Sequence, residues 1–310
     1  MVQASAWDLV WAVGSLANNF RPSSKVTLSI LHDTWSECRE CDLGVSRAQV
    51  GGSFVFGEGS LGGVMFIGEG PGKDEEIQGR PFVGECGQFL RELLKGLEFT
   101  NYYVTNAVCC RSWDYAYDTQ GNKIVYKSKK THKDEYIIRD EAPKPVQRSA
   151  CLPRLLQQIY SVDPILLIAL GGAAAETLLG RPIRIQAENG ILQNAQIPGA
   201  GYIPQLTPKG AWSRMAGAKA DRRLISPITQ NYVTYPVIPL IHPAFAMANH
   251  MDRRPDSVMR MFVTGLQKAR NVYAAYRQEV YGEQLVHYEL GDRLLTEALE
   301  KDGYVDSDFN

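Results

Sequence analysis

Cysteines are the residues of this chain whose type and spacing most clearly suggest chemistry. Cys38 and Cys41 form a C-x2-C pair in the polar segment CREC, a spacing that lets two thiolates reach one metal centre. Cys110 and Cys151 are candidates for two further ligands, and four thiolates hold either tetrahedral zinc or an iron–sulfur cluster. Because these two cysteines form no second C-x2-C pair, zinc is the weaker interpretation. The alternative is a set of unrelated buried cysteines, which suits Cys86 better than the CREC pair.

A glycine-rich stretch, FIGEGPGKDEEIQGRPFVGECGQFL, spans residues 66–90. It lacks G-x-x-x-x-G-K-[ST], and Lys73 stands where G-x-G-x-x-G needs its third glycine, so neither nucleotide-binding pattern is present. The glycines alone indicate only a tight turn, because glycine tolerates positive φ. Phe82 lies on the proline-stiffened loop GRPFVG and has the side chain to stack on a planar ring. Ordinary core packing is the alternative for this phenylalanine.

Two polar side chains follow other predicted strands. Asn106, in VTNAVCCR, carries an amide donor and an acceptor side by side, which matches the edge of a pyrimidine. The alternative role for Asn106 is to cap the turn after the strand. His242, in LIHPA, ends an apolar run, and Pro243 restricts its backbone. A lone histidine is more often structural than catalytic. A functional site is indicated only if an aromatic ring, an amide and an imidazole meet at one edge.

Apolar runs predict the elements that position these residues. Strands are expected at 62–68, 102–108, 165–171 and 235–242, and helices at 26–41, 85–97, 151–162, directly after 171, and 256–278. Strands that alternate with helices predict a parallel sheet covered on both faces. Ligands of such sheets bind beyond the carboxyl ends of the strands. The segments that arrive there are 68–72, Asn106, Gly171 and His242.

Composition bounds the function and the organisation of the 310 residues. Apolar content is 45% and net charge is −1, so a nucleic-acid surface has to be a local patch, such as YKSKKTHK at 126–133. A solvated charge run is the alternative for that patch. We expect no membrane span and no signal peptide, and therefore an intracellular, cytoplasmic protein. The expected organisation is an N-terminal extension (1–25), one domain (26–280) with insertions at 112–147 and 181–235, and a C-terminal tail (281–310).

Several blocks of the sequence resemble the family 4 uracil-DNA glycosylases, the iron–sulfur members of the uracil-DNA glycosylase superfamily. The blocks occur in the family's order and are CRECDLGVSR, VFGEG, FIGEGPGKDEEIQGRPFVGECGQFLRELL, YYVTNAVCCR, CLPRLLQQI, PILLIALGGAAAETLLG and LIHPA. The resemblance implies a three-layer α/β/α sandwich with a central, mostly parallel four-stranded sheet. It also implies a [4Fe–4S] cluster held by Cys38, Cys41, Cys110 and Cys151, with neither Cys86 nor Cys109 as a ligand.

The resemblance also implies roles for the residues at the sheet edge. Phe82 would stack on a flipped uracil, and Asn106 would read its N3–H and O4 edge. His242 would donate to O2 of the leaving base. Gly68, Glu69 and Gly70 would line the pocket, with Glu69 as the candidate for activating water.

The activity implied is that of a monofunctional glycosylase, which excises uracil from single- or double-stranded DNA and leaves an abasic site. Two features differ from the family pattern: Gly70 replaces the alanine of GEAPG, and FAMANHMDRR follows the histidine motif. In that loop, Phe245 or Met247 is a candidate wedge into the DNA helix, and Arg253 and Arg254 are candidate phosphate contacts. The alternatives are a non-catalytic DNA-binding or replication accessory protein on the same fold, and a glycosylase for a modified pyrimidine.

Overall fold

The computed structural model describes residues 28–129, 131–198, 232–252, 254 and 256–282. The predicted extension at 1–25 and almost all of the predicted tail at 281–310 lie outside the described residues, as does most of the predicted insertion at 181–235. Within the described part, no helix has the length and apolar character that a membrane crossing requires.

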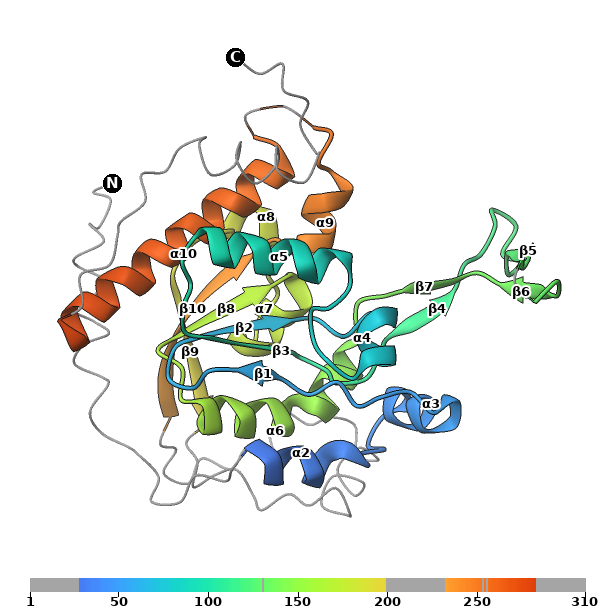
Figure 1. The fold of residues 1–310 in the computed structure, drawn as a ribbon, viewed down its shortest axis with the longest axis horizontal. Coiled ribbons are helices and arrows are strands. Elements are labelled where there is room, and N and C mark those ends of the chain that lie inside the picture. The colour runs from blue at the N-terminus through green and yellow to red at the C-terminus, as the bar shows by residue number, and fades with distance from the viewer. Residues whose placement is uncertain (1–27, 130, 199–231, 253, 255, 283–310) are drawn as a thin grey trace.

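A mixed sheet of six described strands forms the centre of the molecule (Figure 1). Its order is β1-β3-β2-β8-β10-β9, and the four inner strands run parallel to one another. The bounds are β1 Glu58–Gly59, β2 Val64–Gly68, β3 Tyr102–Asn106, β8 Leu166–Leu170, β9 Gln193–Pro198 and β10 Tyr232–Leu240. The inner strands are the four that the sequence predicted. The predicted number of strands was wrong, because β1 and β9 pair antiparallel at the two edges and lack a long apolar run.

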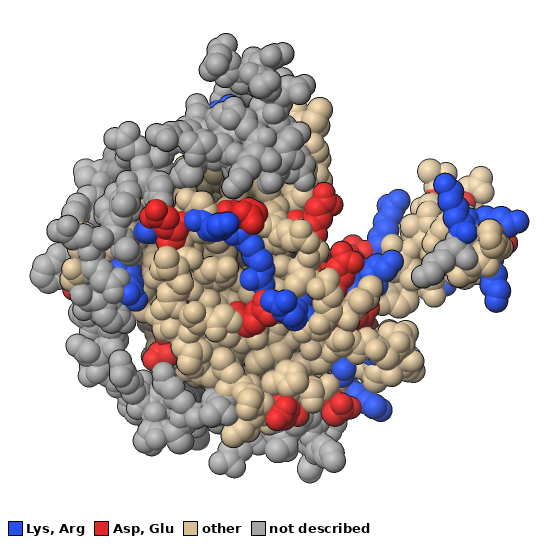
Figure 2. Space-filling view, viewed as in Figure 1, with Lys and Arg blue, Asp and Glu red and all other residues tan. Residues whose placement is uncertain are grey.

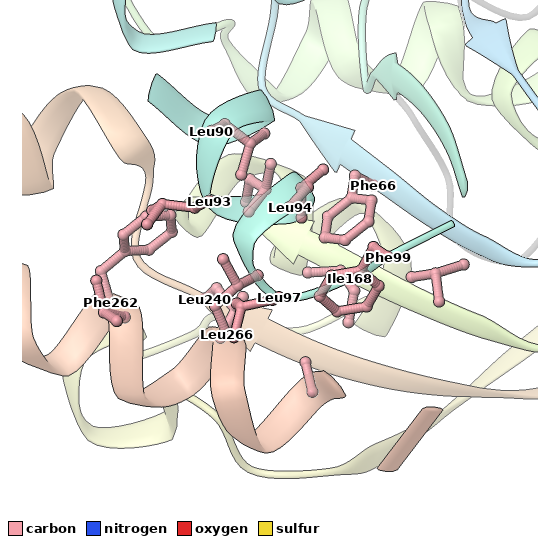
Figure 3. Close-up of a cluster of buried hydrophobic side chains, with 14 of the residues drawn as sticks. Phe66, Leu90, Leu93, Leu94, Leu97, Phe99, Ile168, Leu240, Phe262 and Leu266 are labelled. Atoms are coloured by element: carbon pink, nitrogen blue, oxygen red, sulfur yellow. The ribbon is translucent and has the colours of Figure 1, made fainter. Parts of the chain in front are cut away.

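Helices cover both faces of the sheet, which confirms the three-layer α/β/α architecture. On one face, α5 (Glu85–Gly96) and α10 (Val258–Tyr281) pack on the strands through the cluster in Figure 3, which includes Phe66, Leu94 and Phe262. On the other face, α6 (Pro145–Val162) and α7 (Gly172–Leu179) cover the alternate residues of the same strands. Successive strand residues point to opposite faces, so one apolar run supplies both clusters.

Shorter helices complete the layers and correct one prediction. The bounds are α2 Leu28–Ser36, α3 Asp42–Val50, α4 Lys73–Gln78, α8 Ile185–Glu188 and α9 Pro243–Ala248. The predicted helix at 26–41 ends at Ser36, and the CREC pair lies in the turn between α2 and α3. The indole of Trp35 donates to Gln157 Oε1 at 2.7 Å, which fixes α2 against α6.

The predicted insertion at 112–147 forms an arm that projects from the sheet (Figure 1). We define the arm as residues 112–141, because the amide of Glu141 donates to the carbonyl of Ser112 at its base. Its strands are β4 Trp113–Tyr115, β5 Val125–Lys127, β6 Asp134–Tyr136 and β7 Ile138–Asp140, with β4 paired to β7 and β5 to β6. The last residues of the predicted insertion belong to α6, which begins at Pro145.

Candidate functional site

Gly68, Phe82 and Asn106 meet at the carboxyl edge of the sheet. Gly68 and Asn106 are partners in the register of β2 and β3. A methyl group added at Gly68 would lie 2.3 Å from Asn106 Oδ1 and 2.8 Å from Phe82 Cζ. The amide and the aromatic ring therefore lie directly over the glycine, which leaves no room for a side chain. An aromatic face beside a donor–acceptor pair suits a flat heterocycle.

The loop that carries Phe82 is held by a buried carboxylate. Glu75 is 8% exposed, and its Oε1 accepts the amides of Val83 at 3.0 Å and Gly84 at 2.9 Å. Its Oε2 accepts the amide of Gly72 at 3.1 Å. One side chain thus joins the turn after β2 to the Phe82 loop, and it satisfies three backbone donors.

Helix α5 holds the same loop from the other side. Phe82 has φ 54°, a left-handed conformation that is uncommon for a non-glycine residue. Arg91 Nε donates to the Phe82 carbonyl at 2.9 Å, and Arg91 Nη2 donates to the Pro81 carbonyl at 2.9 Å. Gly87 allows this close approach, because a methyl there would lie 2.3 Å from the Phe82 carbonyl carbon. Strain of this kind persists only where the surroundings fix it, and it clusters at functional sites.

Asn106 is fixed through its backbone by a buried arginine. Arg154 of α6 is 0% exposed, and its Nη2 donates to the carbonyls of Asn106 at 2.8 Å and Ala107 at 2.7 Å. Its Nη1 donates to Gln158 Oε1 at 2.7 Å. The Asn106 side chain is 3% exposed, and it has no hydrogen-bond partner among the described residues. The backbone is locked while the amide stays available to a ligand.

Glu69 directly follows β2 and lies beside the start of α7. Its Oε1 accepts the amide of Ala173 at 3.0 Å. Gly171, at φ 96°, gives it room, because a methyl there would lie 2.3 Å from the same oxygen. A carboxylate is favoured at a helix N-terminus, where free amides carry partial positive charge. The side chain is half-buried and therefore partly accessible to solvent.

His242 caps the start of α9 with its imidazole ring. Its Nδ1 accepts the amide of Ala244 at 3.2 Å, so a neutral imidazole carries its proton on Nε2. Burial lowers the pKa of His242 below its ordinary value, and the negative charges of Glu69 and Glu75 oppose that shift. We conclude that the effect of burial outweighs that of the two carboxylates. At neutral pH the imidazole is therefore neutral, and its Nε2–H is a donor.

Gly70 has a different environment from Gly68. A methyl at Gly70 would meet Val108 Cγ2 at 3.0 Å and Pro143 only at 4.0 Å. It would point toward Val108, with neither Phe82 nor Asn106 within 4 Å. The replacement of alanine by glycine at this position therefore leaves the wall formed by Phe82 and Asn106 unchanged.

The four predicted cysteine ligands line one cavity. Cys38 and Cys41 come from the turn before α3, Cys110 from the segment after β3, and Cys151 from α6. The rest of the lining is largely apolar, with Trp35, Leu43, Phe54 and Val108 among it. Neither Cys86 nor Cys109 lines this cavity. Burial raises the pKa of Cys38 to about 11 and that of Cys110 to about 12, as expected for thiols in apolar surroundings.

Arg154 also connects the cysteine cavity to the sheet edge. Its Nη2 lies 3.4 Å from Cys151 Sγ, in addition to its contacts with the Asn106 strand. Hydrogen bonding from the Cys109 thiol lowers the pKa of Cys151, and Arg154 adds to that shift. Cys109 itself is fully buried beside Cys151. The cysteine cavity and the end of β3 therefore share one buried cation.

The loop after His242 differs in part from its predicted role. Phe245 is 44% exposed on α9, whereas Met247 is half-buried and packs against the hydrophobic core. Arg254 pairs with Asp252 at 2.7 Å, so its charge is already matched locally. Arg253 lies outside the described residues. Of the predicted DNA contacts in this loop, Phe245 is the one whose exposure suits a wedge.

Glu75 and Arg154 are structural residues of this site that motifs in the sequence did not single out. Each is a buried charge, and neither belongs to an apolar periodicity that would mark it as core. The run KDEE gave a signal for Glu75, since an acid three residues after Gly72 suits the start of a helix. For Arg154, the signal in the sequence is a cationic residue at a position of α6 that faces the core.

Comparisons with known proteins agree with this geometry. The family model described as the uracil DNA glycosylase superfamily matches residues 56–263. Among curated relatives, the type-4 uracil-DNA glycosylase of Thermotoga maritima is 32% identical over 150 residues, which is 47% of this chain and 63% of the relative. The type-4 uracil-DNA glycosylase of Pyrobaculum aerophilum is 34% identical over 155 residues, which is 49% of this chain and 64% of the relative. The chain thus spans less than two thirds of the length of these relatives.

These relatives confirm the resemblance that the motifs indicated. The matched residues include β2, β3, β8 and β10, the Phe82 loop and His242. The match to the family model covers more than half of the chain. The protein therefore belongs to the uracil-DNA glycosylase superfamily.

Proposed function

We propose that this protein removes uracil from DNA by hydrolysing the N-glycosidic bond, and that it leaves an abasic site. The observation that carries the proposal is the contact of Phe82 and Asn106 over Gly68, beside Glu69 and His242. The names of the relatives support the same substrate. A protein that acts on DNA would work inside the cell.

Base recognition would use the Phe82 ring and the Asn106 amide. Extruding a uracil costs a few kcal/mol, and stacking on an aromatic ring returns about 1–3 kcal/mol. The donor and acceptor of the Asn106 amide would pair with O4 and N3–H of uracil. Cytosine presents the reverse order on that edge, so one of its groups would be left unpaired at a further cost.

Catalysis would use His242 as a neutral donor. When the glycosidic bond breaks, negative charge develops on the uracil base and positive charge on the sugar. A positioned donor to a developing anion is worth about 3–4 kcal/mol, and Nε2–H of His242 is the candidate. Glu69 would favour the cationic sugar and orient water, because its carboxylate is held at the start of α7.

The resident cofactor would be a [4Fe–4S] cluster bound by Cys38, Cys41, Cys110 and Cys151. Four thiols from three chain segments around one largely apolar cavity are the donor set that such a cluster requires. Among the described residues, no group of three metal-binding side chains is close enough to share a single ion. A cluster does not need that proximity, because each thiolate binds a different iron. The cluster would join the three segments and act structurally.

Uracil is a better candidate substrate than a modified pyrimidine on one observation. The Gly70 position points at Val108 and Pro143, so the loss of the alanine methyl adds no space beside Phe82 and Asn106. The pocket wall thus offers no extra volume there for a base substituent.

The test is cleavage of labelled single-stranded and duplex oligonucleotides that contain one uracil, followed by alkali. Wild type should give strand scission, and Asn106→Ala should lose at least two orders of magnitude in rate while it still binds DNA. A matched substrate with cytosine in place of uracil should stay intact. Absence of scission by wild type, with DNA binding intact, would overturn the proposal and favour a non-catalytic DNA-binding protein.

A further inference from the structure

The arm carries a cluster of lysines at its outer end. We define the tip as residues 126–133, between β5 and β6. Lys127, Lys129 and Lys133 are exposed there, and no acid occurs anywhere between residues 119 and 133. Figure 2 shows basic side chains on this projecting part of the surface. The tip is therefore cationic, whereas the arm as a whole holds six Lys and Arg residues and six Asp and Glu residues.

Backbone and side-chain hydrogen bonds give the tip a definite shape. The amide of Ser128 donates to the carbonyl of Lys133 at 2.9 Å, and the amide of His132 donates to the carbonyl of Ser128 at 2.9 Å. Thr131 Oγ1 donates to Glu135 Oε1 at 2.5 Å. The lysines therefore stand on a closed turn, which limits the entropy that a ligand would have to remove.

The two acids next to the tip lie on β6, within the same ribbon. Glu135 accepts from Thr131 and from the Tyr126 hydroxyl at 3.0 Å, while Asp134 lies opposite Lys127 in the strand register. Among the described residues, Lys129 and Lys133 form no ion pair. At least two cations at the tip are thus free to bind an anion.

Aromatic rings lie exposed along the same ribbon. Tyr117, Tyr126 and Tyr136 are 48%, 45% and 52% exposed. Lys123 Nζ stacks 3.5 Å from the centroid of the Tyr115 ring, which holds the ribbon together near its middle. An isolated two-stranded ribbon is marginally stable in water, so exposed rings and cations on it indicate a surface that a partner covers.

The base of the arm is fixed beside the turn that follows β2. Arg111 Nε donates to Asp140 Oδ1 at 2.5 Å, and Arg111 also lies 3.6 Å from Glu76 of α4. Asp140 lies next to Gly72, where an added methyl would be 3.3 Å from its carboxylate. The base of the arm therefore lies beside the turn that carries Gly68 and Glu69. Strands rise about 3.3 Å per residue, so the extended chain from Asp140 to Lys133 reaches roughly 20 Å outward.

We propose that the arm is a second DNA-binding element, whose tip lysines contact the sugar–phosphate backbone away from the extruded base. The proposal rests on the proposed function, because it assigns the arm to the same DNA. Duplex DNA rises about 3.4 Å per base pair, so the tip would reach about six base pairs from the pocket. A two-stranded ribbon fits the major groove, and cations on its turn reach the phosphates beside it. The contacts would be independent of sequence, because they are made to phosphates.

The experiment measures binding of a uracil-free duplex at increasing salt, for wild type and for the triple variant Lys127→Gln/Lys129→Gln/Lys133→Gln. Each phosphate contact contributes about −0.9 to the slope of log K against log salt, so three contacts give a difference of up to about 2.7. Between 50 and 200 mM salt, wild type should then lose up to about 40-fold more affinity than the variant. The triple variant Lys127→Arg/Lys129→Arg/Lys133→Arg keeps the charges and should retain the wild-type slope.

A length series gives the second measurement. Wild type should bind a 24-base-pair duplex more tightly than a duplex too short to reach the tip, and the glutamine variant should lose this difference. Thermal unfolding of the three proteins should agree, because the substituted side chains are exposed. An unchanged slope and an unchanged length effect in the glutamine variant would overturn the proposal and point to a protein partner for the arm. Arm-dependent binding without uracil excision would overturn the proposed function alone, whereas excision without arm-dependent binding would overturn the arm proposal alone.

Discussion

The turn at residues 68–87 and the arm at residues 112–141 are both long irregular connections that follow a strand, yet they hold their shapes by different means. In the turn, a buried carboxylate accepts three backbone amides, and two glycines allow contacts that no other residue permits. In the arm, backbone pairing between short strands supplies the order, and most side chains face solvent. Substitution should therefore be costly in the turn and at its supports, and tolerated in the arm.

Loss of a cluster ligand should give the largest effect. Cys110→Ser removes one of four thiols around the cavity, so we expect loss of the broad visible absorbance and of most of the bound iron. Cys109→Ser is the matched control, because Cys109 is the neighbouring cysteine and does not line the cavity. Iron content and visible spectra of anaerobically purified proteins give the result. Retention of the cluster in Cys110→Ser, or a colourless wild type with stoichiometric zinc, would contradict the assignment.

Replacement of Arg154 should have the next largest effect. Arg154→Met leaves the carbonyls of Asn106 and Ala107 without their donor, so we expect a loss of about 3–5 kcal/mol in the free energy of unfolding. Arg148→Met, on the same helix, breaks a partly exposed pair with Glu176 and should cost at most about 1 kcal/mol. Urea denaturation measures both.

Activity separates a positioning role for Arg154 from a merely structural one. The Arg154→Lys variant keeps a buried cation and should recover part of the stability. It should have reduced kcat, because a single ammonium nitrogen cannot occupy the positions of both Nη1, which contacts Gln158, and Nη2, which contacts the two carbonyls. Equal kcat in Arg154→Lys and wild type would show that Arg154 does not position Asn106.

A pair of glycine substitutions tests the turn directly. Gly68→Ala forces a methyl onto Asn106 Oδ1 and Phe82, so we expect a loss of about 1–3 kcal/mol in stability and on the order of 100-fold in uracil excision. Gly70→Ala, two residues away, meets only a valine methyl at 3.0 Å and should stay near wild type in both measurements. Comparable activity of the two variants would contradict the proposed geometry of the pocket.

His242 should make stability depend on pH in a defined direction. Its pKa in the folded protein lies below the ordinary value of about 6.5, so the unfolded chain binds a proton first as the pH falls. The free energy of unfolding should therefore fall as the pH drops below about 6.5, by at most about 1.4 kcal/mol per pH unit from this residue, and level off below the folded pKa. Urea denaturation at pH 7.5 and 5.5 should show a smaller difference in His242→Asn than in wild type. The opposite order would mean that the folded protein stabilises the imidazolium.

The smallest effect is expected in the arm. Tyr136→Ser removes a ring that is 52% exposed, and it should change the free energy of unfolding by no more than about 0.5 kcal/mol. Phe66→Ser removes a fully buried ring from the cluster in Figure 3 and should cost several kcal/mol or prevent folding. Thermal denaturation compares the two. A large destabilisation by Tyr136→Ser would mean that the arm packs on another part of the protein and is not free to meet DNA.

The sequence by itself predicted the parallel core and the residues of the pocket edge. Alternating apolar runs identify β2, β3, β8 and β10, because each of these strands has to bury both faces. Gly68, Asn106 and His242 then follow from the rule that parallel strands end at one edge. Phe82 is identified separately, as an aromatic residue on a proline-stiffened loop. Edge strands such as β9 and the arm have weaker patterns, because one or both of their faces meet solvent.

Only the tertiary structure revealed what holds the pocket edge in place. Glu75 and Arg154 are charged residues buried by neighbours that are distant in the sequence. The spacing of residues along the chain does not identify those neighbours. The same reason explains why Cys109 and Cys110, adjacent in sequence, have different surroundings: Cys110 faces the cysteine cavity, and Cys109 packs beside Cys151 and Arg154. Local pattern determines which segments become strands and helices, whereas the burial of a charge depends on contacts that form only when those segments pack.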